Sequence, residues 1–190
     1  MSRVQEILDM FAGSPIVAAV KSDELLDAAL SSSSSIVFIL YGSLLTIASE
    51  VQRIKASGKT AIVHVDLVEG LGRDPVAVDY IKHETKADGI ISTKQPLVRR
   101  AHELGLIAGQ RTFIVDSMAL ENTKSQLRNF RPDFLEVMPG LLTGIIDELH
   151  VVSEVPLVAG GLIRTKKEIL EALRGGSCAI STTKRELWSL

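Results

Sequence analysis

The sequence predicts an α/β fold, a compact (β/α)8 TIM barrel that forms a single domain over residues 1–190. Short apolar runs recur at intervals of roughly two dozen residues, and a helical pattern follows each run. The runs consist almost entirely of Val, Ile, Leu and Ala, which is typical of parallel strands buried on both faces. The expected strands are 16–20, 36–40, 61–65, 89–92, 112–115, 134–137, 156–159 and 178–181. A flavodoxin-like sheet of five or six strands is the alternative, and it would require two or three of these strands to be absent.

Two segments flank the first predicted strands. Val4, Ile7, Leu8 and Phe11 lie at helical spacing and are followed by glycine and proline, so we expect an N-terminal helix that closes the bottom of the barrel. The serine run 31–35 lies between the first βα helix and the second strand, and we expect a solvated loop without chemistry on the non-functional face.

The helices between the strands carry start and stop signals. Asp74-Pro75 begins one helix, and Gly58 and Gly105 end two others. Capping boxes are expected at Thr165-x-x-Glu168 and Thr183-x-x-Glu186. One helix is expected to carry an inward apolar stripe, formed by Leu97, Val98, Ala101 and Leu104. The short loops that remain suit a barrel of below-average length.

Composition narrows the class of protein. The start of the chain lacks the pattern of a signal peptide, and no apolar run approaches the roughly 18 residues of a membrane span, so we expect a cytoplasmic protein without a membrane partner. The single cysteine, Cys178, excludes an internal disulfide and is expected to be a small core residue. A formal charge of −2 gives no global attraction to nucleic acid, so any RNA binding would depend on a local basic patch.

Glycines and hydroxyls follow the last two predicted strands. In TIM barrels ligands bind at the carboxyl ends of the strands, and phosphate sites recur after strands seven and eight. Gly160 and Gly161 would let backbone N–H groups approach an anion, and a helix N-terminus after Ser181, Thr182 and Thr183 would add donors and a favourable dipole. These residues are therefore expected to bind a phosphate, although a tight turn and an ordinary helix cap would look the same.

The opposite half of the same rim is expected to be acidic. Asp and Glu side chains there could accept hydrogen bonds from the hydroxyls of a small polyol phosphate, or could form structural ion pairs with nearby cations. His64 could contact the ligand or make a hydrogen bond within the barrel. The further ligand-binding candidates are His64 and Asp66 at strand three, Glu69 in the next loop, Lys94 beyond strand four, Arg111 before strand five, Asp116 after it, and Glu136 in strand six.

Six segments at these strand ends resemble the glycerol uptake operon antiterminators, bacterial regulators that respond to glycerol-3-phosphate. They span most of the chain: 64–71, 89–94, 110–117, 136–140, 159–163 and 179–183. The resemblance implies glycerol-3-phosphate as the ligand, no other cofactor, and antitermination at a leader messenger RNA of glycerol-utilisation genes. The sequence lacks aromatic RNA-binding motifs, and its local basic clusters are Arg99-Arg100, Arg164 with Lys166 and Lys167, Arg174, and Lys184-Arg185.

An enzyme acting on a small phosphorylated polyol or sugar is the alternative to a regulator. Lys94, Asp66 and Glu136 would then be catalytic, through a Schiff base, proton transfer or a bound divalent metal. The sequence has no nucleophile elbow and no metal-ligand spacing, so no catalytic or metal-binding residue is assigned. A sensor that contacts only a protein partner, and a homo-oligomer, both remain open.

Overall fold

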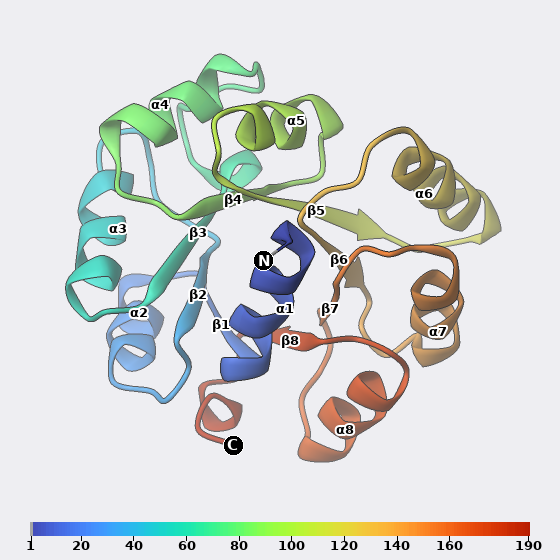
Figure 1. Ribbon diagram of the computed structural model, residues 1–190. Coiled ribbons are helices and arrows are strands. Elements are labelled where there is room, and N and C mark those ends of the chain that lie inside the picture. Colours follow the sequence, from blue (N-terminus) through green and yellow to red (C-terminus); the bar gives the residue numbers. More distant parts are fainter. Residues whose placement is uncertain (1) are drawn as a thin grey trace.

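The computed structural model describes residues 2–190 as a closed barrel of eight parallel strands, with neighbours hydrogen-bonded in sequence order and β8 closing on β1 (Figure 1). This confirms the predicted (β/α)8 fold and excludes the open flavodoxin-like sheet. The strands are β1 (Ile16–Val20), β2 (Ile36–Ile39), β3 (Thr60–His64), β4 (Gly89–Ser92), β5 (Ile107–Phe113), β6 (Phe134–Met138), β7 (Leu157–Gly160) and β8 (Ala179–Thr182).

A ring of helices surrounds the barrel, and the N-terminal helix lies across one of its ends (Figure 1). The helices are α1 (Arg3–Gly13), α2 (Asp23–Leu30), α3 (Ile47–Ala56), α4 (Val76–Glu84), α5 (Gln95–Glu103), α6 (Ser117–Asn129), α7 (Thr143–Val152) and α8 (Lys166–Arg174), with the short 3-10 helices η1 (Val65–Leu67) and η2 (Arg185–Leu187). No helix within residues 2–190 combines the length and the apolar character needed to cross a membrane.

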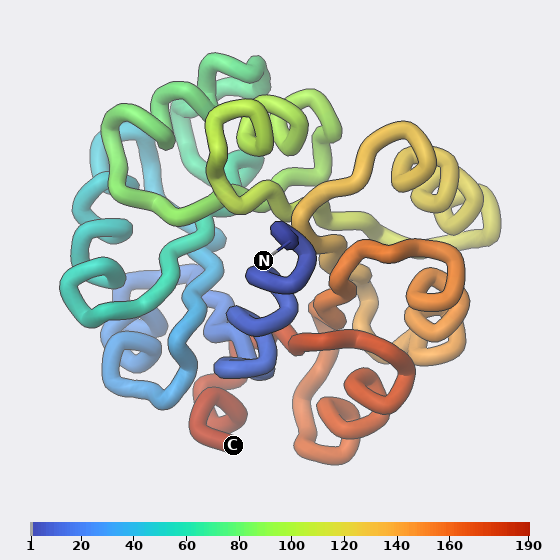
Figure 2. The backbone as a smooth tube through the Cα atoms, in the orientation of Figure 1, coloured from blue at the N-terminus to red at the C-terminus, as the bar shows by residue number. Residues whose placement is uncertain are grey.

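Helix α1 lies across the amino-terminal end of the barrel, as expected (Figure 2). Its buried Ile7 and Phe11 pack into the barrel interior, where the Phe11 ring meets the Phe134 ring edge-to-face at 5.5 Å. Arg3 anchors the helix through hydrogen bonds to both carboxylate oxygens of Asp133, which directly precedes β6. With this end closed, the interior can open only at the carboxyl ends of the strands.

The strand residues alternate between two apolar layers. Val17, Phe38 and Ile62 belong to the barrel interior, whereas Ala18 and Val37 pack outward against the helices. Each strand therefore sends every second residue toward the barrel axis, and the last inward residues on each strand surround the carboxyl-end opening.

The fifth strand differs from its prediction. It begins at Ile107, five residues before the expected start, so Arg111 lies within the strand and not before it. Gly109 is required where the Phe134 ring packs against the strand, and Gln110 and Arg111 are polar but buried. A strand with glycine and polar residues at these positions lacks the continuous apolar run by which the other strands are recognised.

Three local predictions are also corrected. The third strand ends at His64 and not at residue 65, and Asp66 lies in the separate helix η1. The capping box expected at Thr183 is absent, because η2 is preceded by Lys184, whose side chain forms no cap, whereas the box at Thr165 is present. Ser34, in the serine run, is buried and its hydroxyl accepts the Ala18 N–H, which ties the run to β1.

Candidate functional site

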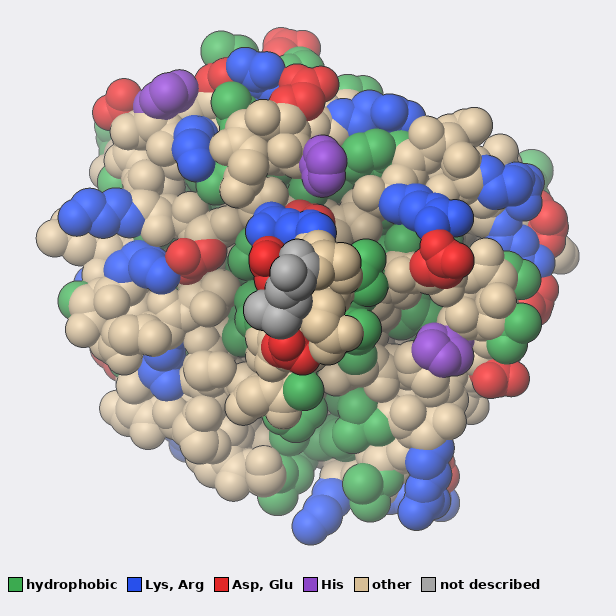
Figure 3. Space-filling model, viewed as in Figure 1, with side chains coloured by type: hydrophobic (Ala, Val, Ile, Leu, Met, Phe, Trp, Pro, Cys, Tyr) green, Lys and Arg blue, Asp and Glu red, His purple; other side chains and the backbone are tan. Residues whose placement is uncertain are grey.

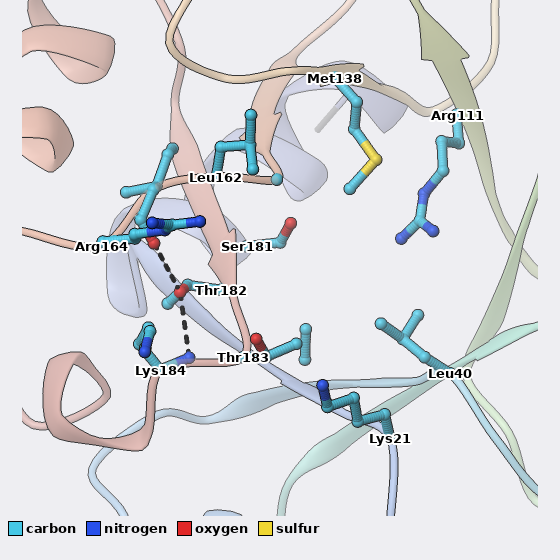
Figure 4. A pocket seen from close by; sticks show the side chains of 13 residues that line it. Lys21, Leu40, Arg111, Met138, Leu162, Arg164, Ser181, Thr182, Thr183 and Lys184 are labelled. Atoms are coloured by element: carbon cyan, nitrogen blue, oxygen red, sulfur yellow. Dashed lines mark hydrogen bonds between the residues drawn. The ribbon is translucent and has the colours of Figure 1, made fainter.

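The carboxyl-end opening of the barrel contains a cavity of about 330 Å³. Its walls come from the ends of β1, β2, β5 and β6 and from the loops after β7 and β8 (Figure 4). The cavity walls combine charged side chains, hydroxyls and backbone with apolar surface from Ala19, Leu40, Met138, Leu162 and Ile163. A cavity of this size and composition suits a small polar metabolite.

Four cationic side chains line this cavity: Lys21, Arg111, Arg164 and Lys184. No carboxylate is among the lining residues. The ion pairs within residues 2–190 include Arg111 with Glu136 but none of Lys21, Arg164 and Lys184. The cavity therefore holds an excess of positive charge, which favours an anionic ligand.

Arg111 forms an ion pair with a buried acidic residue, Glu136. Glu136 is 0% exposed and accepts hydrogen bonds from the Arg111 Nε–H and the Ser181 hydroxyl. Gly160 leaves the space for this carboxylate, because a Cβ at that position would lie 2.5 Å from Glu136 Oε1 and 2.7 Å from Ser181 Oγ. Figure 4 shows the Arg111 side chain pointing into the cavity, so Glu136 fixes the orientation of a cation that faces the cavity.

A tight turn follows β7 at the cavity wall. Gly161 and Leu162 have left-handed φ values of +72° and +61° in succession, a conformation that is uncommon for leucine. The Gly140 N–H donates to the Gly160 carbonyl at 2.6 Å and ties this turn to the loop after β6. Such turns can direct consecutive backbone N–H groups at an anion, as the paired glycines of the sequence suggest.

The hydroxyls at the carboxyl end of β8 have different roles. Thr182 Oγ1 donates to the Ile163 carbonyl and accepts the Lys184 N–H, so it joins the end of β8 to the loop after β7. Thr183 is exposed at the cavity wall, and its side chain has no hydrogen bond to another residue of the described chain. The donors expected from a helix N-terminus are reduced here, because only the three-residue η2 follows.

The acidic side chains of the rim were expected to contact the ligand, but none of them lines the cavity. Asp66 accepts hydrogen bonds from Ser92 Oγ at 2.7 Å, Thr93 N–H at 2.8 Å and Thr93 Oγ1 at 2.7 Å, and Lys94 Nζ lies 3.9 Å away. Burial alone would raise the pKa of Asp66, but these hydrogen bonds outweigh it and the pKa is lowered. Asp66 and Lys94 thus form an ion pair, which is one of the two roles that the sequence left open.

His64 lies inside the barrel and outside the cavity lining. It is 2% exposed, and its Nδ1 atom has no hydrogen-bond partner within residues 2–190. Burial, with a further contribution from the Arg111 charge, lowers the pKa of His64 to about 4. The imidazole is therefore neutral at physiological pH.

Two other predicted acidic contacts lie away from the cavity. The exposed Glu69 uses its backbone N–H to bind the Gly42 carbonyl. The carboxylate of Asp116 caps α6 by accepting the Ala119 N–H at 2.8 Å. No group of three or more His, Cys, Asp and Glu side chains within residues 2–190 could hold a metal ion.

The predicted ligand residues thus separate into two groups. Those that line the cavity are Arg111, Gly161, Ser181, Thr182 and Thr183; those that do not are His64, Asp66, Glu69, Lys94, Asp116, Glu136 and Gly160. The sequence reasoning missed Lys21, which lies two residues after the inward Ala19 and could have been found by alternation. It treated Arg164 and Lys184 only as basic clusters, although they follow the seventh and eighth strands.

Comparisons with known proteins cover the strands and loops that build this cavity. The family model described as "Glycerol-3-phosphate responsive antiterminator" matches residues 16–188. The chain is 36% identical over 184 residues to the "Uncharacterized protein YgcP" of Escherichia coli (strain K12), covering 97% of this chain and 96% of that protein. Among solved structures, the glycerol uptake operon antiterminator regulatory protein of Listeria monocytogenes str. 4b F2365 superposes with a TM-score of 0.88 at 28% identity, over 91% of this chain and 94% of that chain. A glycerol uptake operon antiterminator-related protein of Thermotoga maritima MSB8 superposes with a TM-score of 0.83 at 31% identity, over 92% of this chain and 98% of that chain.

Proposed function

Because the chain belongs to the family of glycerol-3-phosphate responsive antiterminators, we propose that it binds glycerol-3-phosphate in the carboxyl-end cavity and regulates transcription termination at a leader messenger RNA of glycerol-utilisation genes. The observation that carries the ligand assignment is the cluster of four cations around a small cavity, of which Lys21, Arg164 and Lys184 have no carboxylate partner within residues 2–190. A phosphate monoester carries a charge of nearly −2 at neutral pH and matches this excess.

The two ends of the ligand require different contacts. The phosphoryl group fits the β7 and β8 side of the cavity, where Gly161, Thr183 and Lys184 offer backbone, hydroxyl and ammonium donors. The glycerol end would then face Arg111, whose guanidinium can donate to hydroxyl oxygens. In this arrangement Arg111 contacts the polyol hydroxyls in place of the carboxylates that the sequence predicted for this role, since the Glu136 carboxylate already accepts a hydrogen bond from Arg111.

The geometry favours binding over turnover. Lys94, the Schiff-base candidate, is not among the cavity-lining residues and lies 3.9 Å from the Asp66 carboxylate. Glu136 is fully buried and accepts two hydrogen bonds, so it is poorly placed to exchange protons with a substrate. We therefore propose a ligand-binding regulator and not an enzyme.

Calorimetric titration with glycerol-3-phosphate, glycerol and inorganic phosphate tests the ligand assignment. We expect saturable binding of the ester, little binding of glycerol, and weaker binding of phosphate. Gly161→Val should weaken ester binding at least tenfold, because the added side chain meets Met138 Cε from 3.2 Å and cannot easily keep the left-handed φ.

The matched control is Gly58→Val, which imposes the same kind of backbone strain at φ +76° with open space around the new Cβ, at the opposite end of the barrel. Equal ester affinity in the two variants would show that the β7 turn does not bind the phosphate. Absence of ester binding by the wild-type protein at millimolar concentration would refute the ligand assignment.

A further inference from the structure

We propose that the RNA is bound by a basic rim around the mouth of the ligand cavity, formed by Lys21, Arg164, Lys166, Lys184 and Arg185. The proposal rests on the proposed function, since it names the surface at which that function would meet its RNA. Three of these five side chains also line the cavity, so the ligand and the RNA would occupy adjoining parts of one positively charged surface.

The residues of the basic rim come from the segments that follow three neighbouring strands. Strands β7, β8 and β1 are consecutive around the barrel, with Gly160 paired to Ser181 and Ala18 paired to Thr182. The hydrogen bond from Thr182 Oγ1 to the Ile163 carbonyl joins the loop after β7 to the segment after β8. Cations that are distant in sequence therefore lie on one sector of the carboxyl-end rim.

Few acidic groups neutralise this sector. Glu168 is nearby and its carboxylate accepts the backbone N–H groups of Arg164 and Thr165, but within residues 2–190 it forms no ion pair with a side chain of the basic rim. Arg185 Nε lies 3.9 Å from Glu186 Oε1, and both side chains are largely exposed, so this pair contributes little. The side chains of Lys166 and Lys184 form no ion pair within residues 2–190, which leaves them available to RNA phosphates.

The amino-terminal face of the barrel is a poorer candidate. Figure 3 shows positive and negative side chains interspersed over this face around α1. The basic residues at this end include Arg3, which pairs with Asp133 at 3.0 Å, and Lys55, which pairs with Asp88 at 2.7 Å. Cations held in such pairs contribute less to phosphate binding than unpaired ones, because the pairs must first be broken.

The composition of the basic rim predicts how RNA is recognised. Lysine and arginine side chains without an aromatic platform bind phosphates and read shape, so the contribution of this surface should depend strongly on salt and weakly on sequence. Lys21, Arg164 and Lys184 belong to both the cavity and the basic rim, so we expect ligand and RNA binding to be coupled. By linkage, each would then change the affinity for the other by the same factor.

Charge reversal outside the cavity tests the location. We compare Lys166→Glu/Arg185→Glu with the control Lys82→Glu/Lys86→Glu, since both double variants change the net charge equally and all four side chains are exposed. Lys82 and Lys86 lie in the last turn of α4 and just beyond it, away from the basic rim. The probe is a fluorescein-labelled 24-nucleotide stem–loop RNA, followed by fluorescence anisotropy at several salt concentrations with saturating glycerol-3-phosphate.

The basic-rim variant should bind the RNA roughly 25- to 60-fold more weakly than the control at about 0.1 M salt, with a salt slope shallower by about 1.4 to 1.8. Both variants should keep the calorimetric affinity for glycerol-3-phosphate within about threefold of wild type, because none of the four residues lines the cavity. Equal loss in the two variants, or no loss in either, would overturn the location while leaving ligand-dependent RNA binding by the wild type intact. If the wild type does not bind RNA with or without ligand, the location and the proposed function both fail.

Discussion

Glu136→Gln should strongly destabilise the protein, because Glu136 is the buried partner of Arg111. The carboxylate is 0% exposed and Arg111 is 7% exposed, so the two charges compensate each other away from solvent. Breaking a buried pair by removing one charge typically costs about 3–5 kcal/mol, and we expect about 3 kcal/mol because glutamine can keep a hydrogen bond to Ser181. For a chain of this length, that corresponds to a fall in Tm of roughly 6–12 °C.

Thermal and urea unfolding followed by circular dichroism measure this effect. The matched control is Glu154→Gln, which removes the partner of Arg131 in a pair whose side chains are 64% and 81% exposed, and it should change the free energy of unfolding by less than about 1 kcal/mol. Replacing Arg111 and Glu136 together by methionine should recover much of the stability, while glycerol-3-phosphate binding is lost. Equal destabilisation by Glu136→Gln and Glu154→Gln would refute the view that Glu136 compensates a buried charge.

Three further predictions concern neighbouring residues. In the unfolded state His64 has the usual His pKa of about 6.5, whereas in the folded state its pKa is about 4. Because the unfolded state takes up the proton first as the pH falls, the free energy of unfolding of the wild type should drop by about 3 kcal/mol relative to that of His64→Gln between these two pH values. Urea unfolding at a series of pH values checks this, and parallel curves for the two proteins would contradict it. Asp116→Ala should cost about 1 kcal/mol through loss of the α6 cap and leave calorimetric ligand affinity unchanged, whereas a large loss of affinity would restore its assignment as a ligand contact. Gly160→Ala should displace Glu136 and weaken glycerol-3-phosphate binding about tenfold in calorimetry, while Gly144→Ala, with open space at its Cβ, should have no effect; equal affinities would contradict the packing account.

The fold could be predicted from sequence because most strands are continuous apolar runs. Strands β1 (Ile16–Val20) and β4 (Gly89–Ser92) were predicted with their observed bounds, and the others except β5 differ by one residue at one or both ends. Strand β5 was the exception, since Gly109 and the buried polar Gln110 and Arg111 interrupt the apolar pattern. Only Arg111 of these residues lines the cavity, whereas Gly109 makes room for the Phe134 ring and Gln110 donates to Gln126 Oε1. Both the site and the packing around it therefore interrupt the apolar run.

The site was harder to predict because sequence shows where a charge lies but not what it pairs with. Asp66 and Glu136 both follow or occupy strands near the rim, as candidate ligand residues should. Only the three-dimensional structure shows that Ser92 and Thr93 bind the first, and that Arg111 binds the second. These contacts join residues that lie 25 or more positions apart, a separation at which no spacing rule operates.

In the proposed function, a ligand in the cavity controls transcription termination. In vitro transcription of a glycerol-utilisation leader from the genome that encodes this chain tests this, with a terminator downstream and readthrough measured at increasing protein concentration. We expect readthrough to rise only when the protein and glycerol-3-phosphate are both present, and Gly161→Val to require at least tenfold more ligand for the same rise. Readthrough that is identical with and without glycerol-3-phosphate, for a protein that binds the ester in calorimetry, would contradict it.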